Sequence, residues 1–214
     1  MKLFSYFRSS AAYRVRIALN LKGLTYEYVP VHLTREGGEQ FSSEFRKLNP
    51  QALVPVLQDG EHALAQSLAI IEYLDEVHPH PPLLPKAPAS RARVRALAQA
   101  IACEIHPLNN LRILNYLTGV LGVSEDARRN WYRHWVAAGL RALEEKLAGN
   151  TETGLFCHGD APGLADCCLV PQLANARRFK CDLSHYPTLL ALEKNCQALE
   201  AFQRAAPNQQ PDAE

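Results

Sequence analysis

The stretch RSSAAYRVRIAL, residues 8–19, follows a short apolar segment and leads into Lys22-Gly23. Two adjacent serines therefore stand where a strand would end and an amphipathic helix would begin, and serine is favoured at a helix N-terminal cap. The first backbone N–H groups of a helix have no partner within it, and the helix dipole places partial positive charge at this end. The stretch predicts an anion site at a helix start, and a thiolate bound there would add chemistry to affinity.

The segments around this stretch predict a strand–helix–strand unit. Residues 2–6 and 25–31 are rich in apolar, aromatic and β-branched side chains, as short strands are. Between them, apolar residues recur at near-helical spacing, Arg14, Arg16 and Lys22 carry the charge, and a glycine ends the pattern. A strand–helix–strand order predicts a right-handed parallel crossover.

The next segment predicts a hairpin and a second helix. Residues 54–64 are typical of two short strands turned at Asp59-Gly60. Residues 68–76 have the pattern of an amphipathic helix, with Ser67 at its cap or first turn. The order βαβ then ββα predicts a small α/β domain over residues 1–80.

Prolines mark the boundary of this domain. Five prolines fall between His78 and Pro88, a composition that predicts a semi-rigid linker over residues 81–88. Every long segment beyond the linker has a helical pattern, so residues 89–214 predict an all-helical domain.

Three local expectations apply inside the helical domain. A long helix should bend just before Pro107, because proline removes a helical hydrogen bond. A later helix, capped by Ser124, is expected to turn Trp131 and Trp135 toward a core. Residues 207–214 are expected to fray at the end of the chain.

Composition argues against several classes of function. The formal net charge is +1 and the basic residues are scattered, which predicts no nucleic-acid partner. No apolar run approaches the roughly 20 residues of a membrane span and no signal-peptide core is seen, so we expect a cytoplasmic protein without a membrane partner. The six cysteines lack a C-x-x-C pair and the eight histidines lack ligand spacing. This pattern predicts buried free thiols and no metal.

Several motifs occur together in a recognisable order. They are SYFRSS (5–10), RVRIAL (14–19), Val54-Pro55, QSLAIIEYL (66–74), and LAD (164–166) ahead of LVPQ (169–172). The chain resembles the zeta class of glutathione transferases over nearly its whole length. The resemblance implies glutathione transferase architecture: an α/β thioredoxin-like N-terminal domain with a cis Pro55, an all-α C-terminal domain and a homodimer.

The resemblance also implies the roles of particular residues. Ser9 matches the hydroxyl that holds and activates the glutathione thiol, with Ser10 beside it and Arg8 next to it as a third catalytic candidate. The other implied glutathione-binding residues are Gln40, Val54 through its backbone, Gln66 and Ser67 at the γ-glutamyl end, and His106, Asn110 and Arg112 in the second domain. The implied substrate-binding residues are Arg8, Arg112 and Arg178.

The implied activity is glutathione-dependent cis–trans isomerisation of a small unsaturated keto diacid. Conversion of maleylacetoacetate to fumarylacetoacetate, a step of tyrosine degradation, is the first interpretation, and conversion of maleylpyruvate to fumarylpyruvate is the second. A glutathione transferase or glutathione-binding protein without efficient isomerase activity is the third. Residue by residue, simpler explanations exist, since Ser9 alone could be only a helix cap and a helical arginine is usually solvated.

Two positions depart from the pattern of the zeta class. Ala11 stands where the class usually has a cysteine, two residues after the catalytic serine, which argues against a cysteine nucleophile in the chain itself. Gly163 stands where a serine or threonine commonly caps the helix that holds Asp166. Glycine at a cap costs only a few tenths of a kcal/mol, so that helix should persist.

Overall fold

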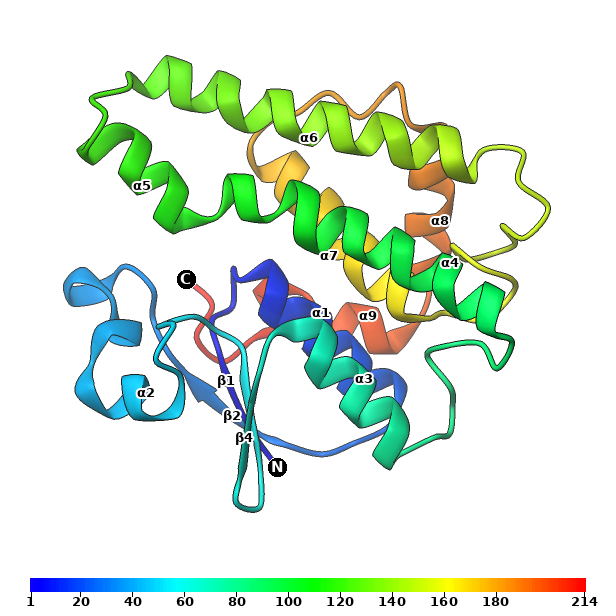
Figure 1. The fold of residues 1–214 in the computed structure, drawn as a ribbon, viewed down its shortest axis with the longest axis horizontal. Helices are drawn as coiled ribbons and strands as arrows, with labels where there is room; N and C mark the ends of the chain where they lie inside the picture. Colours follow the sequence, from blue (N-terminus) through cyan, green and yellow to red (C-terminus); the bar gives the residue numbers. More distant parts are fainter. The chain divides into compact units, whose positions relative to one another are not determined.

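The strand–helix–strand unit expected around residues 8–19 is present. In the computed structural model, which describes all 214 residues, β1 (Lys2–Ser5) leads into α1 (Ser10–Leu21), and α1 leads into β2 (Glu27–Pro30) (Figure 1). β1 and β2 pair in parallel, with Lys2 opposite Glu27 and Ser5 opposite Pro30. The parallel pairing of the two strands that the sequence predicted is therefore confirmed.

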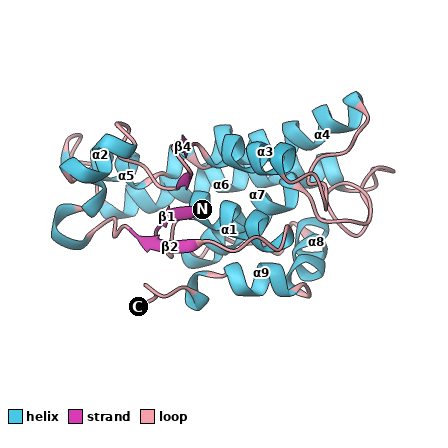
Figure 2. Cartoon of the chain, turned by 90° about the horizontal axis from the view of Figure 1, so that it is seen from below, coloured by secondary structure: helices cyan, strands magenta, loops and turns pink.

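The predicted hairpin and helix complete one mixed sheet. β3 (Val56–Asp59) and β4 (His62–Ala65) pair antiparallel, and α3 (Ser67–Val77) follows directly. The strand order is β2-β1-β3-β4, with β1 antiparallel to β3, and Figure 2 shows the strands in magenta. The connection from β2 to β3 contains three short helices, which are η1 (Arg35–Gly37), η2 (Glu39–Phe41) and α2 (Ser43–Leu48). The implied cis bond is present at Val54–Pro55.

The charged residues of α1 and the lysine that caps its C-terminal end are buried. Arg14, Arg16 and Lys22 are all less than a tenth exposed. The Lys22 ammonium group donates to the Asp75 carboxylate at 2.8 Å and to the carbonyls of His78 and Pro81 at 2.7 and 2.9 Å. A buried charge is stable only when it is paired in this way. The helical pattern locates these residues, but only the fold supplies their acceptors.

The chain divides into two compact units, which are residues Met1–Leu84 with Gln197–Glu214, and residues Pro85–Cys196. The sequence placed all of residues 89–214 in the helical domain, so the last part of the chain differs from that expectation. α9 (Glu200–Ala205) buries Phe202 and Ala205 and lies beside α1 (Figure 1). Burial of this apolar face explains why the C-terminal segment belongs to the first unit.

The end of the chain is also more ordered than expected. η5 (Pro207–Gln209) follows α9, and the side chain of Gln210 donates to the carbonyls of Arg204 and Ala206 at 2.9 and 2.8 Å. The prediction that residues 207–214 fray is therefore wrong, because hydrogen bonds tie them to the first unit.

The regular elements of the second unit are all helices. They are α4 (Pro88–Gln99), the π-helix η3 (Ala100–Ile105), η4 (Pro107–Asn109), α5 (Leu111–Gly119), α6 (Glu125–Leu147), α7 (Leu164–Arg178) and α8 (Pro187–Gln197). The connection between α6 and α7 adds one isolated bridge between Thr153 and Gly159. At Pro107 the helix type changes from π (η3) to 3-10 (η4) with His106 still helical, and the backbone first leaves helical geometry at Asn110. On α6, Trp131 and Trp135 are only half-buried, and Tyr132 and Val136 take the core positions instead. No helix of the chain is both long and apolar enough to cross a membrane.

Gly139 on α6 allows η3 to approach closely. A Cβ atom at this position would clash with the side chain of Ile105, which is buried on η3 and has no room to move away. We expect Gly139→Ala to lower the free energy of unfolding by about 1–2 kcal/mol, since overpacking outweighs the better helix propensity of alanine. Urea denaturation of the variant measures this change.

Gly119→Ala is the matched control for that experiment. Gly119 is also helical, but nothing lies within 4 Å of the position of its Cβ. This variant should be neutral or stabilised by up to about 1 kcal/mol. Equal effects of the two substitutions would show that the approach of η3 to α6 does not limit stability.

Candidate functional site

Three strand ends meet at one edge of the sheet. Phe4 of β1 lies opposite Val56 of β3, and Val56 lies opposite Ala65 of β4. Three segments therefore lie next to one another here. They are the loop after β1, the Val54–Pro55 bond before β3 and the start of α3 after β4. This edge holds the serine pair of α1, Val54, and the pair Gln66 and Ser67.

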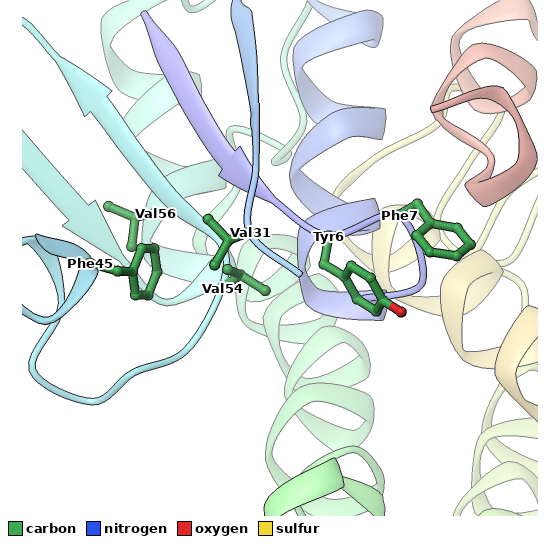
Figure 3. Close-up of a cluster of buried hydrophobic side chains, with 6 residues drawn as sticks. All are labelled: Tyr6, Phe7, Val31, Phe45, Val54 and Val56. Atoms are coloured by element: carbon green, nitrogen blue, oxygen red, sulfur yellow. The ribbon is translucent and has the colours of Figure 1, made fainter. Parts of the chain in front are cut away.

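A cluster of buried side chains lies beneath this edge (Figure 3). Its members are Tyr6, Phe7, Val31, Phe45, Val54 and Val56, with Phe4 and Leu33 packed against it. The rings of Tyr6 and Phe7 meet edge to face at 4.8 Å between centroids. Because close packing restricts side-chain movement, the cluster holds both the loop before Ser9 and the backbone at Val54.

Ser9 is the N-terminal cap of α1. Its backbone is extended, and its hydroxyl oxygen accepts from the Ala12 N–H at 3.2 Å. A serine hydroxyl has one hydrogen to donate besides its acceptor sites, so the cap leaves its O–H able to donate to an anion. Ser10 begins the helix and is buried, and the first turn of α1 contains no acidic residue. The positive end of this helix dipole is thus not offset locally.

Gln66 and Ser67 form a second helix start at the same edge. Gln66 has φ of +70°, which is unusual for a residue with a side chain and is typical of functional sites. Its amide donates to the Gln51 side chain at 3.0 Å. Ser67 begins α3 and accepts from the Arg14 guanidinium at 3.2 Å, and the first turn of α3 also lacks an acidic residue. Two helix N-termini and a buried arginine therefore favour negative charge here.

Gln40 and Arg8 differ in how they are held. The Gln40 side chain is buried and donates to the Leu33 carbonyl at 3.3 Å, while its own carbonyl oxygen is buried without a partner. A buried acceptor without a donor is costly and is a place where a ligand N–H would bind favourably. Arg8 is exposed, with its guanidinium 4.7 Å from the centre of the Phe7 ring.

The second unit carries the other sequence candidates. His106 follows the π-helix η3, and π-helical turns are frequent at functional sites. Asn110 caps α5 by accepting from the N–H of Arg112 at 3.1 Å, so its side-chain oxygen already has a structural role. Arg112 is exposed, and Arg178 is the last residue of α7, with its guanidinium 4.8 Å from the centre of the Phe179 ring.

Hydrogen bonds and stacking connect these parts within the second unit. Trp131 donates to the Leu108 carbonyl at 2.8 Å, which attaches η4 to α6. The next residue, Tyr132, stacks on Phe179 with ring centres 3.7 Å apart. Burial raises the pKa of the Tyr132 phenol, and the nearby charge of Arg178 partly offsets that rise. The segment 106–112 and the end of α7 that carries Arg178 are thus both held against α6.

Two residues of the first unit's edge were not singled out from the sequence. Gln51 binds the side chain of Gln66, and Arg14 binds Ser67. Arg14 does leave a sequence signal, because it lies three and seven residues before Ile17 and Leu21 and thus on the apolar face of the helix. Gln51 leaves none, since its contact depends on how the hairpin folds.

The chain's own cysteines do not provide a nucleophile at the edge of the first unit or beside residues 106–112 of the second. All six are free thiols, Cys103 is exposed, Cys181 is half-buried and the other four are buried. Burial raises the pKa of the Cys157, Cys167 and Cys196 thiols, which keeps them protonated. No group of three or more His, Cys, Asp or Glu side chains is arranged to hold a metal ion.

Comparison with known proteins identifies relatives along the whole chain. Residues 1–76 match the family model "Glutathione S-transferase, N-terminal domain". The "Probable maleylacetoacetate isomerase" of Vibrio cholerae is 57% identical over 211 residues, which span 99% of this chain and 97% of that protein.

Two solved structures are similar over their full length. The "Holo structure of Maleyl Pyruvate Isomerase", described as a bacterial zeta-class glutathione S-transferase, is 50% identical with a TM-score of 0.97, and the match covers 100% of both chains. The maleylacetoacetate isomerase of Methylobacterium extorquens AM1, solved with bound malonate and GSH, is 41% identical with a TM-score of 0.96, again over 100% of both chains.

Proposed function

Because the chain belongs to the zeta class of glutathione transferases, we propose that it is a glutathione-dependent isomerase that converts maleylacetoacetate to fumarylacetoacetate. The observation that carries the proposal is the edge of the first unit, where a capping serine with a free O–H lies at a helix start without acidic residues. That arrangement suits a thiolate. Glutathione is the cofactor, and it is regenerated in each turnover.

Ser9 keeps the sulfur of glutathione ionised in this proposal. A free thiol of this kind has a pKa near 8.5, so only a few per cent is thiolate at neutral pH. A hydrogen bond donated by Ser9, together with the N-terminal dipole of α1, stabilises the anion and lowers that pKa. Ser10, at the first position of the helix, supports the same site.

The remaining edge residues bind the tripeptide. Gln66 and Ser67, at the start of α3, receive the γ-glutamyl end, where the helix dipole and Arg14 favour its carboxylate. Val54 binds through its backbone, and Gln40 offers its unpartnered carbonyl oxygen to an N–H of the ligand. The resemblance to the zeta class also implies glutathione contacts for His106, Asn110 and Arg112; for Asn110 this contact would use its amide N–H, since its oxygen caps α5.

The chemistry needs a nucleophilic sulfur and cations. The thiolate adds to one carbon of the cis double bond, and the electron pair of that bond moves onto the ketone oxygen as an enolate. The carbon–carbon bond, now single, rotates. The electron pair then returns, re-forms the double bond as trans and expels the thiolate. Arg8, Arg112 and Arg178 stabilise the enolate and the two carboxylates, because guanidinium binds carboxylate in a bidentate manner and does not lose its charge.

Maleylpyruvate is the alternative substrate, and a specific observation favours it. The solved maleylpyruvate isomerase matches the chain from end to end. The two substrates share the cis double bond, the ketone and the carboxylates, so the same residues serve either reaction. The malonate in the relative from Methylobacterium extorquens AM1 is itself a small diacid, which supports this substrate class for both readings.

The decisive assay follows both acids with the same enzyme. We expect glutathione-dependent loss of enol absorbance with at least one of maleylacetoacetate and maleylpyruvate, and no reaction when glutathione is omitted. The ratio of the two kcat/KM values identifies the preferred substrate. Absence of turnover with either acid would contradict both readings and leave a transferase or glutathione-binding protein.

The proposal extends to the compartment, the oligomeric state and the pathway of the protein. We infer a cytoplasmic homodimer that acts in aromatic amino-acid catabolism, specifically tyrosine degradation if maleylacetoacetate is the preferred acid. Six free cysteines suit a compartment in which glutathione keeps thiols reduced. Sedimentation of the purified protein would test the dimer.

A further inference from the structure

The loop that leads into Ser9 is held by a buried arginine. Arg16, on α1, is fully buried, and burial lowers the pKa of its guanidinium without removing the charge. It donates to four oxygens, which are Ser5 Oγ at 3.1 Å, the Tyr6 carbonyl at 3.4 Å, the Phe7 carbonyl at 3.1 Å and the Ala205 carbonyl of α9 at 3.0 Å. The loop is thereby joined to the C-terminal part of the chain.

A second charged group binds the same loop from the very end of the chain. One carboxylate oxygen of Asp212 accepts from the Phe7 N–H at 3.1 Å, and the other accepts from the Tyr28 hydroxyl at 2.6 Å. Burial raises the pKa of Tyr28, and the bond to Asp212 raises it further, so the phenol stays protonated and donates. Tyr28 lies on β2, opposite Leu3 of β1.

These contacts leave Phe7 with no free polar backbone group. Its N–H is bound by Asp212, its carbonyl by Arg16, and its ring is buried in the cluster of Figure 3. The peptide on its N-terminal side is held as well, because the Tyr6 carbonyl also accepts from the Ser9 N–H at 2.9 Å. Of these groups, only Asp212 comes from beyond α9.

We propose that Asp212 is a positioning residue for Ser9, which acts by fixing the Phe7 peptide and, through it, the direction of the Ser9 hydroxyl. The inference rests on the proposed role of Ser9 toward the glutathione thiol. A hydroxyl stabilises a thiolate only within hydrogen-bond distance and at a favourable angle. Misplacement of a catalytic group by about 1 Å costs up to about 10²-fold in rate, so a distant tether can have a large effect.

Two substitutions at Asp212 separate positioning from charge. Asp212→Ala removes both acceptors, whereas Asp212→Asn keeps an oxygen for the Phe7 N–H and an amide that can donate to the Tyr28 oxygen. We expect Asp212→Ala to lower kcat about tenfold with a smaller change in glutathione Kd, and to raise the pKa of the bound glutathione thiol. Asp212→Asn should restore most of the kcat and most of the wild-type thiol pKa. If the negative charge itself acted on the thiol, its removal would lower that pKa instead.

Glu214→Ala is the matched control within the same segment. Its carboxylate binds His32 at 3.2 Å and Arg35 at 3.3 Å, but not the loop before Ser9. We expect wild-type kcat and thiol pKa for this variant. Hydrogen exchange of peptides covering residues 6–9 provides a readout without activity, and it should be faster in Asp212→Ala alone.

The outcomes distinguish this inference from the proposed function. Unchanged exchange in Asp212→Ala, or faster exchange with an unchanged thiol pKa, would overturn the positioning role. An inactive wild-type enzyme would contradict the isomerase proposal only, since exchange and ultraviolet titration of the bound thiolate still test Asp212.

Discussion

Ser9→Ala is expected to lower kcat by about 10²–10³-fold while changing glutathione affinity far less. A loss of kcat of this size is typical when one preorganised hydrogen-bond donor to an anion is removed from an active site. Without the Ser9 O–H, the pKa of the bound thiol returns toward its ordinary value near 8.5. The rate should therefore rise with pH over a more alkaline range than in the wild type. Steady-state kinetics across pH, with glutathione binding measured by calorimetry, test both expectations.

A cap-matched serine separates this chemistry from helix stability. Ser124 caps α6 and accepts from the Ala127 N–H at 3.2 Å, the same distance as the Ser9 cap. Each substitution by alanine should cost about 1 kcal/mol of stability. Ser124→Ala should leave kcat unchanged. Equal losses of kcat and glutathione affinity in Ser9→Ala would mean that Ser9 only positions the cofactor.

Arg178→Met is expected to raise the KM for the diacid about 10- to 100-fold with glutathione affinity retained. A hydrogen bond to a charged group contributes about 1.5–3 kcal/mol, which corresponds to this range. Methionine keeps an apolar stem that can lie against Phe179, where the guanidinium lies 4.8 Å from the ring centre. The change therefore removes the charge with little loss of packing, and initial rates at varied diacid concentration measure it.

The neighbouring arginine is the control. Arg177 also lies in the last turn of α7, but its guanidinium is paired with the Glu193 carboxylate of α8. Arg177→Met should lower stability, because Glu193 is buried and loses its partner, yet the KM should stay within about twofold of wild type. An unchanged KM in Arg178→Met would remove Arg178 from the substrate site.

Local patterns were enough to locate the elements that build the proposed site. The apolar run before Arg8, the capping serines and the glycine after Lys22 are short-range signals, and the structure has β1 and α1 where they predict them. Glycine in place of a capping side chain at Gly163 was also expected to be tolerated. There the Asp166 carboxylate, in the first turn of α7, accepts from the N–H of the capping residue Gly163 at 2.9 Å. A side chain of the helix itself therefore binds the backbone at its start.

The conformations of the connecting segments were beyond the reach of such patterns. The left-handed backbone of Gln66 depends on how β4 passes into α3. The unpartnered oxygen of Gln40 depends on the fold of the segment between β2 and β3. Neither leaves a periodic signal, because each is the property of one residue in a connection and not of a repeating helix or strand pattern.

The sequence by itself determined the order of the elements, the serine pair at a helix start and the resemblance that assigns roles to these residues. Only the tertiary structure decided that Arg16 is a buried donor and that Asp212 binds the loop before Ser9. The physical reason is the same in both cases. A charge away from water is stable only where partners converge on it. Those of buried Arg16 come from β1, the loop before Ser9 and α9, and those of half-buried Asp212 come from the same loop and from β2.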